Sequence, residues 1–209
     1  MNKPCSDSPP LCQASSDYSA ELFSAINGYS DVILSAHQSD CCRVYFITAI
    51  PTQLNGVVDE FPADLESLIL YVGKNKNHLK RPLTHIKDSA KHIDDDDLYL
   101  NPCNTTDSCS HSEMICNLLK LKNEIGVIVI PVCNVTLAFA LETAVINRLD
   151  SCLNSNNGRA IPELLTENVI NDLLSLVMTL VRSRIKNHEF DAVCYIDEEL
   201  VTNDYTIKV

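Results

Sequence analysis

The stretch RVYFITAI, residues 43–50, predicts the central strand of this chain. Its β-branched and aromatic side chains favour a strand, which Pro51 ends. The segments at 67–73 (SLILYVG) and 125–135 read as strands in the same way, and the Val/Ile content of the latter predicts that it is buried. A loop is predicted over 51–64. The sequence therefore predicts three strands at the centre of the protein.

Helices are predicted between and after these strands. Pro82 fits only near the start of a helix, which predicts a helix over 81–92. Thr136 can cap the helix that apolar spacing predicts over 137–149. Further helices are predicted at 18–36, 112–122 and 162–186, and a short strand-like piece at 191–196.

Length and composition indicate one globular domain with short terminal extensions. The chain has 209 residues, of which 45% are hydrophobic and 21% charged, and this is enough for a sizeable core. Residues 1–16 are rich in Pro, Ser and Asp and are predicted to be a disordered lead-in. The domain itself is predicted to span 17–200, with an acidic, flexible tail at 201–209.

The formal net charge of −12 limits the partners of the protein. A chain this acidic is repelled by DNA and by anionic membranes at long range, so any contact with nucleic acid must be local. The sequence shows neither a signal peptide nor an apolar run long enough to cross a bilayer. We therefore expect a cytoplasmic or nuclear protein with reduced cysteines and no membrane partner.

A basic cluster stands out against this acidic background. Between residues 74 and 91, a single carboxylate, that of Asp88, accompanies the cations Lys74, Lys76, Lys80, Arg81, Lys87 and Lys91. This local concentration of positive charge indicates one anionic ligand bound at one place.

The stretch CNTTDSCSHSEMIC at 103–116 raises the possibility of a zinc site. The possible ligands are Cys103, Cys109, His111 and Cys116. Their spacings differ from the short Cys-x2-4-Cys pairs of structural zinc sites, so a polar loop that runs into a helix is favoured. The Asp run at 94–97 is likewise interpreted as a solvated loop rather than a metal site.

Several polar residues in or beside the predicted elements are candidates for chemistry. Tyr45 lies in mid-strand and Tyr71 at the end of the next strand, so the two phenols come close if these strands pair. Arg81 and His85 are four residues apart and share one helix face, and the start of that helix offers free N–H groups to a phosphate. Glu142 lies on or beside an apolar face, where a carboxylate must be paired or metal-bound. Both readings of Glu142 stay open, and two strand tyrosines alone are more often core residues than catalytic ones.

The order and spacing of these residues resemble the GIY-YIG endonuclease family. The matching segments are Val44-Tyr45-Phe46-Ile47-Thr48, Tyr71-Val72-Gly73-Lys74, Arg81-x3-His85, Glu142 and Leu153-Asn154. The resemblance covers residues 42–200 and is strongest to the animal endonucleases that carry ankyrin repeats and a LEM domain. It implies an α+β (α/β) fold, with a small, mostly antiparallel sheet of about three strands flanked by helices and with helical N- and C-terminal extensions.

The resemblance also implies a function and roles for individual residues. The expected activity is metal-dependent hydrolysis of phosphodiester bonds in DNA, with branched or bridging DNA as a candidate substrate. The expected cofactor is Mg²⁺ (or Mn²⁺), and no organic cofactor is expected. The resemblance implies that Glu142 binds the metal, Arg81 clamps the scissile phosphate, Tyr45 is the general base and Tyr71 positions water or phosphate. It also implies that Lys74 and Lys80 bind phosphate, that His85 shuttles a proton or orients a neighbour, and that Asn154 fixes the loop over the site and binds phosphate. The pKa of Tyr45 is expected to be lowered by the metal and by nearby cations.

The sequence departs from the family pattern at three places. Arg43 replaces the first Gly of GIY, and Asn75 replaces a Gly, although Asn can also adopt a left-handed turn conformation. Residues 154–157 lack a Lys that often follows the Asn motif, and the chain carries no ankyrin or LEM module. Two alternatives therefore stay open, a catalytically inactive interaction module of the same fold and a nuclease that acts on RNA. The sequence specifies neither the shape of nucleic acid that is cleaved nor the oligomeric state.

Overall fold

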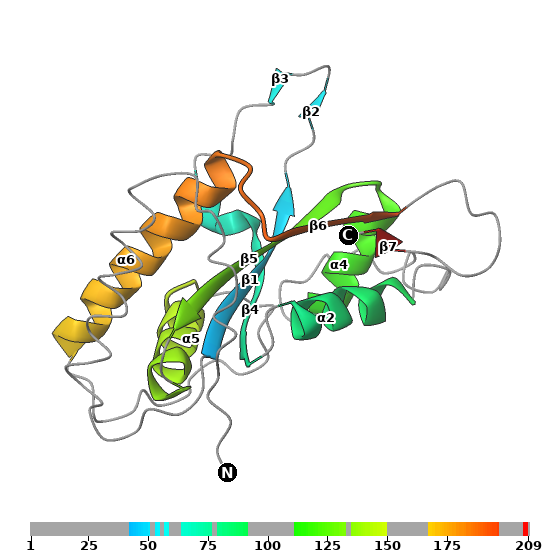
Figure 1. The fold of residues 1–209 in the computed structure, drawn as a ribbon. Coiled ribbons are helices and arrows are strands. Elements are labelled where there is room, and N and C mark those ends of the chain that lie inside the picture. Colours follow the sequence, from blue (N-terminus) through cyan, green and yellow to red (C-terminus); the bar gives the residue numbers. More distant parts are fainter. Residues whose placement is uncertain are drawn as a thin grey trace, which may run out of the picture.

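The computed structural model describes residues 42–50, 53–54, 57–58, 64–76, 79–91, 111–132, 135–149, 167–196 and 207–208. The predicted lead-in, the predicted helix at 18–36, the Asp run and Asn154 lie outside these residues. The described residues form an α+β fold in which a single main sheet carries helices on both faces (Figure 1). The predicted fold class is confirmed.

The centre of the sheet is β1 (Cys42–Ile50), the strand predicted from RVYFITAI. It pairs antiparallel with β4 (Ile69–Asn75) on one side and with β5 (Glu124–Val132) on the other. Eight of its nine residues are buried, since both faces of the strand are covered. This explains why its sequence reads as a continuous apolar run rather than as an alternation of apolar and polar residues.

The sheet has more strands than the three expected. Its order is β4-β1-β5-β6-β7, where β6 is Ala192–Ile196 and β7 is Ile207–Lys208. The chain returns to the edge of β5 because Asp191 fixes it there: its N–H donates to the Val127 carbonyl at 2.8 Å, and its carboxylate accepts from the Val129 N–H at 2.6 Å. The expected flexible tail at 201–209 thus contributes a two-residue strand to the described structure.

Two layers of helices enclose the sheet. Helices α5 (Val135–Leu149) and α6 (Glu167–Lys186) cover one face, and α2 (Lys80–Ala90) and α4 (His111–Lys120) cover the other (Figure 1). Alternate residues of β1 point to opposite layers, as the pleat of a strand requires. Val44 and Phe46 join the core under α5 and α6, whereas Tyr45 and Ile47 join the core under α2 and α4.

Smaller elements connect β1 to β4. The predicted loop at 51–64 contains the short hairpin β2 (Gln53–Leu54) and β3 (Val57–Val58). The 3-10 helix η1 (Leu65–Leu68) follows. It includes the first two residues of the strand that was predicted over 67–73. Its Glu66 forms ion pairs with Arg148 of α5 and Arg182 of α6, which ties η1 to both helices.

Most predicted boundaries agree with the structure to within a few residues. The exceptions have local causes. Helix α5 begins at Val135, so Thr136 lies inside its first turn instead of capping it. Strand β4 continues past Gly73 to Asn75, because pairing with β1 extends that far. Among the described residues, no helix is long and apolar enough to cross a membrane.

Candidate active site

The pairing of β1 with β4 brings the two candidate tyrosines together. Tyr45 lies opposite Gly73 and Ile47 lies opposite Tyr71, so both phenols belong to the face covered by α2. The centroids of the two phenol rings are 6.0 Å apart. The His85 ring of α2 lies against both of them, at 5.0 Å from the Tyr71 ring and 6.4 Å from the Tyr45 ring. The predicted proximity of the phenols is confirmed.

Gly73 makes room for Tyr45, a role that the sequence reading missed. A Cβ atom at position 73 would lie 2.4 Å from the Tyr45 hydroxyl oxygen and 2.5 Å from the ring carbon that bears it. The Tyr45 ring therefore lies directly over the Gly73 backbone. A glycine inside a strand often marks such a close approach, and that signal was present in the sequence.

Replacing Gly73 with alanine should displace the Tyr45 ring, since no Cβ fits beneath it. We expect a loss of about 1–3 kcal/mol in the free energy of unfolding, as for other overpacking changes, measured by urea denaturation. The matched control is Gly126→Ala, in which the new Cβ would meet the Phe190 ring at 2.5 Å, away from the tyrosines. If Tyr45 matters for activity, activity per folded molecule should fall in Gly73→Ala alone. An equal fall in both variants would contradict this.

The start of α2 presents positive charge on the side of the two phenols. Arg81 is exposed, and its Nη1 donates one hydrogen bond of 3.3 Å to the Lys74 carbonyl. Among the described residues no carboxylate forms an ion pair with Arg81 or with the exposed Lys80. Leu79, at the N-cap, makes no side-chain hydrogen bond to the helix. The first turn of α2 thus combines free donors with two cations whose charges are uncompensated in the described part of the chain.

Glu142 and Lys74 meet on the opposite face of the sheet. Lys74 points toward α5, where its Nζ lies 2.6 Å from Glu142 Oε2 and 4.3 Å from the centroid of the Phe139 ring. The Lys74 side chain is 25% exposed and that of Glu142 is 10% exposed. The sequence left open whether Glu142 forms an ion pair or binds a metal, and in the structure it forms an ion pair. Its partner, Lys74, is one of the residues predicted to bind phosphate. The pair and the two phenols therefore lie on opposite faces of the sheet, although Lys74 and Tyr71 belong to the same strand, β4.

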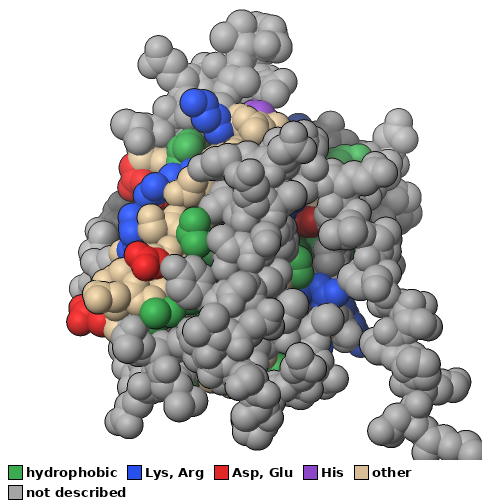
Figure 2. Space-filling view, turned by 60° about the vertical axis from the view of Figure 1, so that its left-hand side comes forward, with side chains coloured by type: hydrophobic (Ala, Val, Ile, Leu, Met, Phe, Trp, Pro, Cys, Tyr) green, Lys and Arg blue, Asp and Glu red, His purple; other side chains and the backbone are tan. Residues whose placement is uncertain are grey.

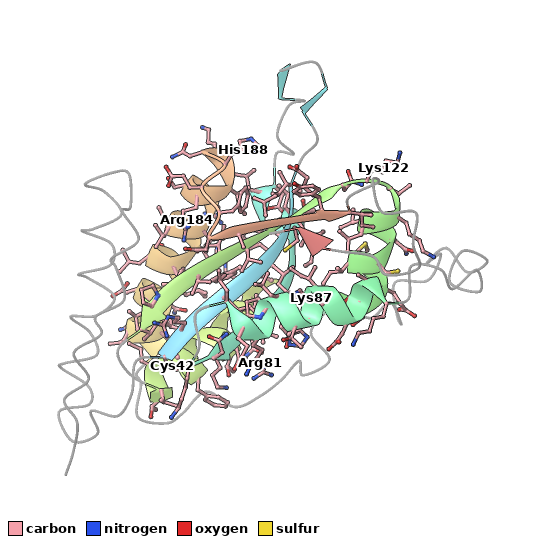
Figure 3. The ribbon with its side chains drawn as sticks, turned by 45° about the vertical axis from the view of Figure 1, so that its right-hand side comes forward. Cys42, Arg81, Lys87, Lys122, Arg184 and His188 are labelled. Atoms are coloured by element: carbon pink, nitrogen blue, oxygen red, sulfur yellow. The ribbon has the colours of Figure 1, made fainter. Side chains whose placement is uncertain are left out.

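A pocket opens where the two faces meet at the end of β4. It has a volume of about 630 Å³ and is lined by Cys42, Lys74, Asn75, Lys76, Lys80, Arg81, Thr84, His85, Asp88 and Val135. Figure 3 shows Arg81 at the start of α2, close to the end of β1 that carries Cys42. The lining has four Lys or Arg side chains and one carboxylate. On the face shown in Figure 2, by contrast, acidic and basic side chains are interspersed.

The pKa of Tyr45 shifts in the direction opposite to that expected. Tyr45 is fully buried, and burial raises its pKa far above the ordinary phenol value; the neighbouring Tyr71 phenol adds to the rise. Arg81 acts in the opposite sense, but its exposed charge does not outweigh the loss of solvent. The Tyr45 hydroxyl makes no hydrogen bond of good geometry among the described residues, but its weaker interaction with the Tyr71 hydroxyl also raises its pKa. The nearby cations alone therefore do not lower this pKa.

Arg43, at the position of the first Gly of the GIY pattern, has a structural role. It is only 8% exposed, and its Nη1 donates to the Lys76 carbonyl at 2.6 Å. This bond holds the chain as it leaves β4, where Lys76 lines the pocket. Asn75 continues β4, and it is not among the described residues with positive φ, so the left-handed conformation considered for it is not used.

Glu142 offers one carboxylate to a divalent cation. The Glu142 carboxylate already holds a positive group through Oε2, and oxygen donors are the ligands that Mg²⁺ prefers. The described residues contain no group of three or more His, Cys, Asp or Glu side chains that could hold a metal. A site with one carboxylate is compatible with Mg²⁺, which usually keeps several waters and takes one or two carboxylates. Glu142 is thus the one predicted ligand, and Asn154 and most of the considered zinc ligands lie outside the described residues.

Comparison with family models, curated proteins and solved structures finds no match to this chain.

Proposed function

We propose that this protein is a metal-dependent endonuclease of the GIY-YIG type that hydrolyses phosphodiester bonds in DNA. One observation carries the proposal. Three residues singled out for this chemistry, Lys74, Arg81 and His85, line one pocket that is basic although the chain is acidic. Of the others, Tyr45 and Tyr71 lie against the His85 ring, and Glu142 is paired with Lys74 on the opposite face of the sheet.

The basic pocket supports the binding of a phosphodiester. Arg81 offers a planar fork of donors that matches two phosphate oxygens, and it stands at the N-terminal end of a helix, where anions are favoured. Lys80 and Lys76 line the same pocket and add positive charge for the flanking phosphates. Because the positive charge is concentrated in one pocket, a protein whose net negative charge repels nucleic acid can still bind it there.

Glu142 supports the requirement for Mg²⁺ or Mn²⁺. Its carboxylate would hold the ion, which when bound supplies stabilisation of the negative charge that develops on the phosphoryl oxygens. Tyr45 would accept the proton of the attacking water. Because burial raises the pKa of Tyr45, this role requires the bound ion to offset the cost of the phenolate. His85 and Tyr71, whose ring centroids are 5.0 Å apart, would orient the water and the scissile phosphate.

Two observations favour a second candidate, a module that binds the nucleic-acid backbone without cutting it. Tyr45 is fully buried with a raised pKa, and Glu142 is already compensated by Lys74. In that case the pocket would still bind phosphate, but the buried phenol and the ion pair would only stabilise the fold. A nuclease that acts on RNA is the third possibility, because phosphate contacts do not distinguish the two sugars.

One assay separates the three candidates. The purified protein is incubated with supercoiled plasmid, branched DNA and single-stranded RNA, each with Mg²⁺ or with EDTA. Nicking of DNA only with Mg²⁺ supports the proposal. Cleavage of RNA alone supports an RNA nuclease. Salt-dependent binding without cleavage of any substrate would overturn the proposal in favour of a binding module.

Tyr45→Phe tests the general base. Activity at saturating Mg²⁺ should rise with pH in the wild type, and the variant should lose about 10²-fold or more in rate together with that rise. The buried hydroxyl makes at most a weak interaction with the Tyr71 hydroxyl, so its removal should change the free energy of unfolding by less than about 1 kcal/mol. The measurement is a pH–rate profile, with Tyr71→Phe as the matched control. An undiminished rate in Tyr45→Phe would move the base role to Tyr71 or His85.

The same substitution has a consequence for stability against pH. The pKa of Tyr45 is higher in the folded protein than in the unfolded chain, where it is about 10. Its contribution to stability is therefore complete below pH ~10 and is lost as the pH rises toward the folded value. Above pH ~10 the free energy of unfolding, measured by denaturation at each pH, should accordingly fall less steeply with pH in Tyr45→Phe than in the wild type.

A further inference from the structure

The ion pair between Lys74 and Glu142 is the strongest link between the two parts of the candidate site. It joins β4 to α5 across 68 positions of sequence, with Lys74 Nζ 2.6 Å from Glu142 Oε2. Lys74 also lines the pocket, together with Arg81 and Lys76. Lys74 therefore contacts the candidate metal ligand through its ammonium group and is also one of the residues that line the candidate phosphate pocket.

Glu142 needs a positive partner in every state of the protein. Leu141, Ala138 and Val145, its neighbours on α5, belong to the hydrophobic core, and a carboxylate left uncompensated there is strongly unfavourable. Among the described residues Lys74 is its sole ion-pair partner. An ammonium and a divalent cation compete for the Glu142 carboxylate, because each must lie within about 3 Å of one of its oxygens and two cations held that close repel each other strongly.

Lys74 is able to leave this position. Its side chain is 25% exposed, the second group that holds it is the face of the Phe139 ring, and a lysine has a long stem with many rotamers. Once released, its ammonium would turn toward the pocket that Lys74 helps to line. Of the partners that the released Lys74 ammonium could bind instead of Glu142, a phosphate oxygen gives the strongest electrostatic attraction.

We propose that Lys74 is an exchangeable counter-ion of Glu142: a divalent cation that binds Glu142 displaces the Lys74 ammonium, which then binds a phosphate of the nucleic acid. The inference rests on the proposed function, because it takes Glu142 as the metal ligand. It goes further by making the binding of metal and of phosphate cooperative. Each ligand should tighten the other by the same factor, as linkage requires.

Metal affinity tests the exchange directly, without any cleavage. Mn²⁺ is titrated into each variant at pH 7.5 in the absence of DNA, and free Mn²⁺ is measured by electron paramagnetic resonance. Lys74→Met should bind Mn²⁺ about tenfold or more tightly than the wild type, because the competing ammonium is gone. Lys80→Met, the matched control, removes a pocket charge that is not paired with Glu142, and should change the affinity by less than about threefold. Equal effects in the two variants, or an unchanged affinity in Lys74→Met, would overturn the exchange.

The second half of the exchange is tested in EDTA by the affinity for a short DNA duplex. Glu142→Gln frees Lys74 and should tighten duplex binding several-fold. The loss of any negative charge near the pocket could also tighten DNA binding. The effect of Glu142→Gln on duplex affinity is therefore measured again in protein that also carries Lys74→Met. There the substitution should have no effect, because the freed ammonium is absent. The same gain in both backgrounds would show that Lys74 takes no part in binding phosphate.

Folding and the proposed nuclease activity are controlled separately. Circular dichroism checks each variant, and Lys74→Gln, with a shorter polar side chain, replaces Lys74→Met if the latter does not fold. Lys74→Arg keeps the charge and should bind Mn²⁺ no more tightly than the wild type. If the Mn²⁺ results are as expected but no nucleic acid is cleaved, the proposed function fails and the exchange stands. If DNA is cleaved but Lys74→Met binds Mn²⁺ like the wild type, the exchange alone fails.

Discussion

Glu142→Gln should abolish DNA cleavage while the protein remains folded. The amide keeps the shape of the side chain but binds a hard cation far more weakly than a carboxylate does. A divalent ion contributes several kcal/mol of transition-state stabilisation, and each ~1.4 kcal/mol is tenfold in rate, so we expect a loss of about 10³-fold or more. The measurement is the nicking rate of supercoiled plasmid at saturating Mg²⁺, corrected for the folded fraction.

Two controls separate a metal ligand from a structural ion-pair partner. Lys74→Met breaks the same pair, and Glu66→Gln removes a carboxylate that pairs with Arg148 and Arg182 away from the pocket. Each control should cost about 1–3 kcal/mol of stability, less than a fully buried pair because the partner lysine or arginines are partly exposed. If Glu142 were only a structural partner, Glu142→Gln would behave like Glu66→Gln and retain metal-dependent turnover per folded molecule.

Arg81→Ala should lower the cleavage rate by about 10²-fold or more, with a much smaller effect on DNA affinity. A guanidinium that clamps the scissile phosphate matters most when charge develops on the phosphoryl oxygens, and loss of one such donor typically has this magnitude. Arg81 is exposed, and within the described part of the chain its guanidinium makes one hydrogen bond, of 3.3 Å to the Lys74 carbonyl, so the fold should survive its removal. The measurements are single-turnover rates and duplex binding in EDTA.

Two matched controls accompany Arg81→Ala: a second substitution of Arg81 itself, and a substitution of another cation on α2. Arg81→Lys keeps the charge but loses the planar fork, so it should recover affinity and little of the rate. Lys87→Ala removes an exposed cation of α2 that does not line the pocket, and it should change neither quantity by more than about twofold. An equal fall of rate and affinity in Arg81→Ala would reduce Arg81 to a residue that only docks the DNA.

Local sequence was sufficient for the elements and for part of the candidate site. The β-branched run at 43–50 predicted β1, and the position of Pro82 predicted the start of α2. The proximity of Tyr45 and Tyr71 followed from two adjacent strands, and that of Arg81 and His85 from the helical repeat. These predictions succeeded because strand preference and helical periodicity depend on residues that are close together in the chain.

The strand count, the role of Gly73 and the role of Arg43 needed the fold. Strand β6 joins the sheet because Asp191 bonds to β5, and Gly73 is needed because β1 places Tyr45 opposite it. Arg43 is compatible with its position because the Lys76 carbonyl lies within reach of its guanidinium. None of these contacts is encoded in the local pattern, since each joins residues from different elements.

Four features could be predicted without the structure: the α+β class, the central strands, the helix that carries Arg81 and His85, and the basic segment in an acidic chain. The folded protein was needed to see that Lys74, rather than another cation, compensates Glu142, and that burial raises the pKa of Tyr45. The reason is physical: secondary structure follows from short-range sterics and hydrogen bonding. The choice of ion-pair partners and the cost of ionising a buried group depend on which surfaces the folded chain brings together and on how much water it excludes.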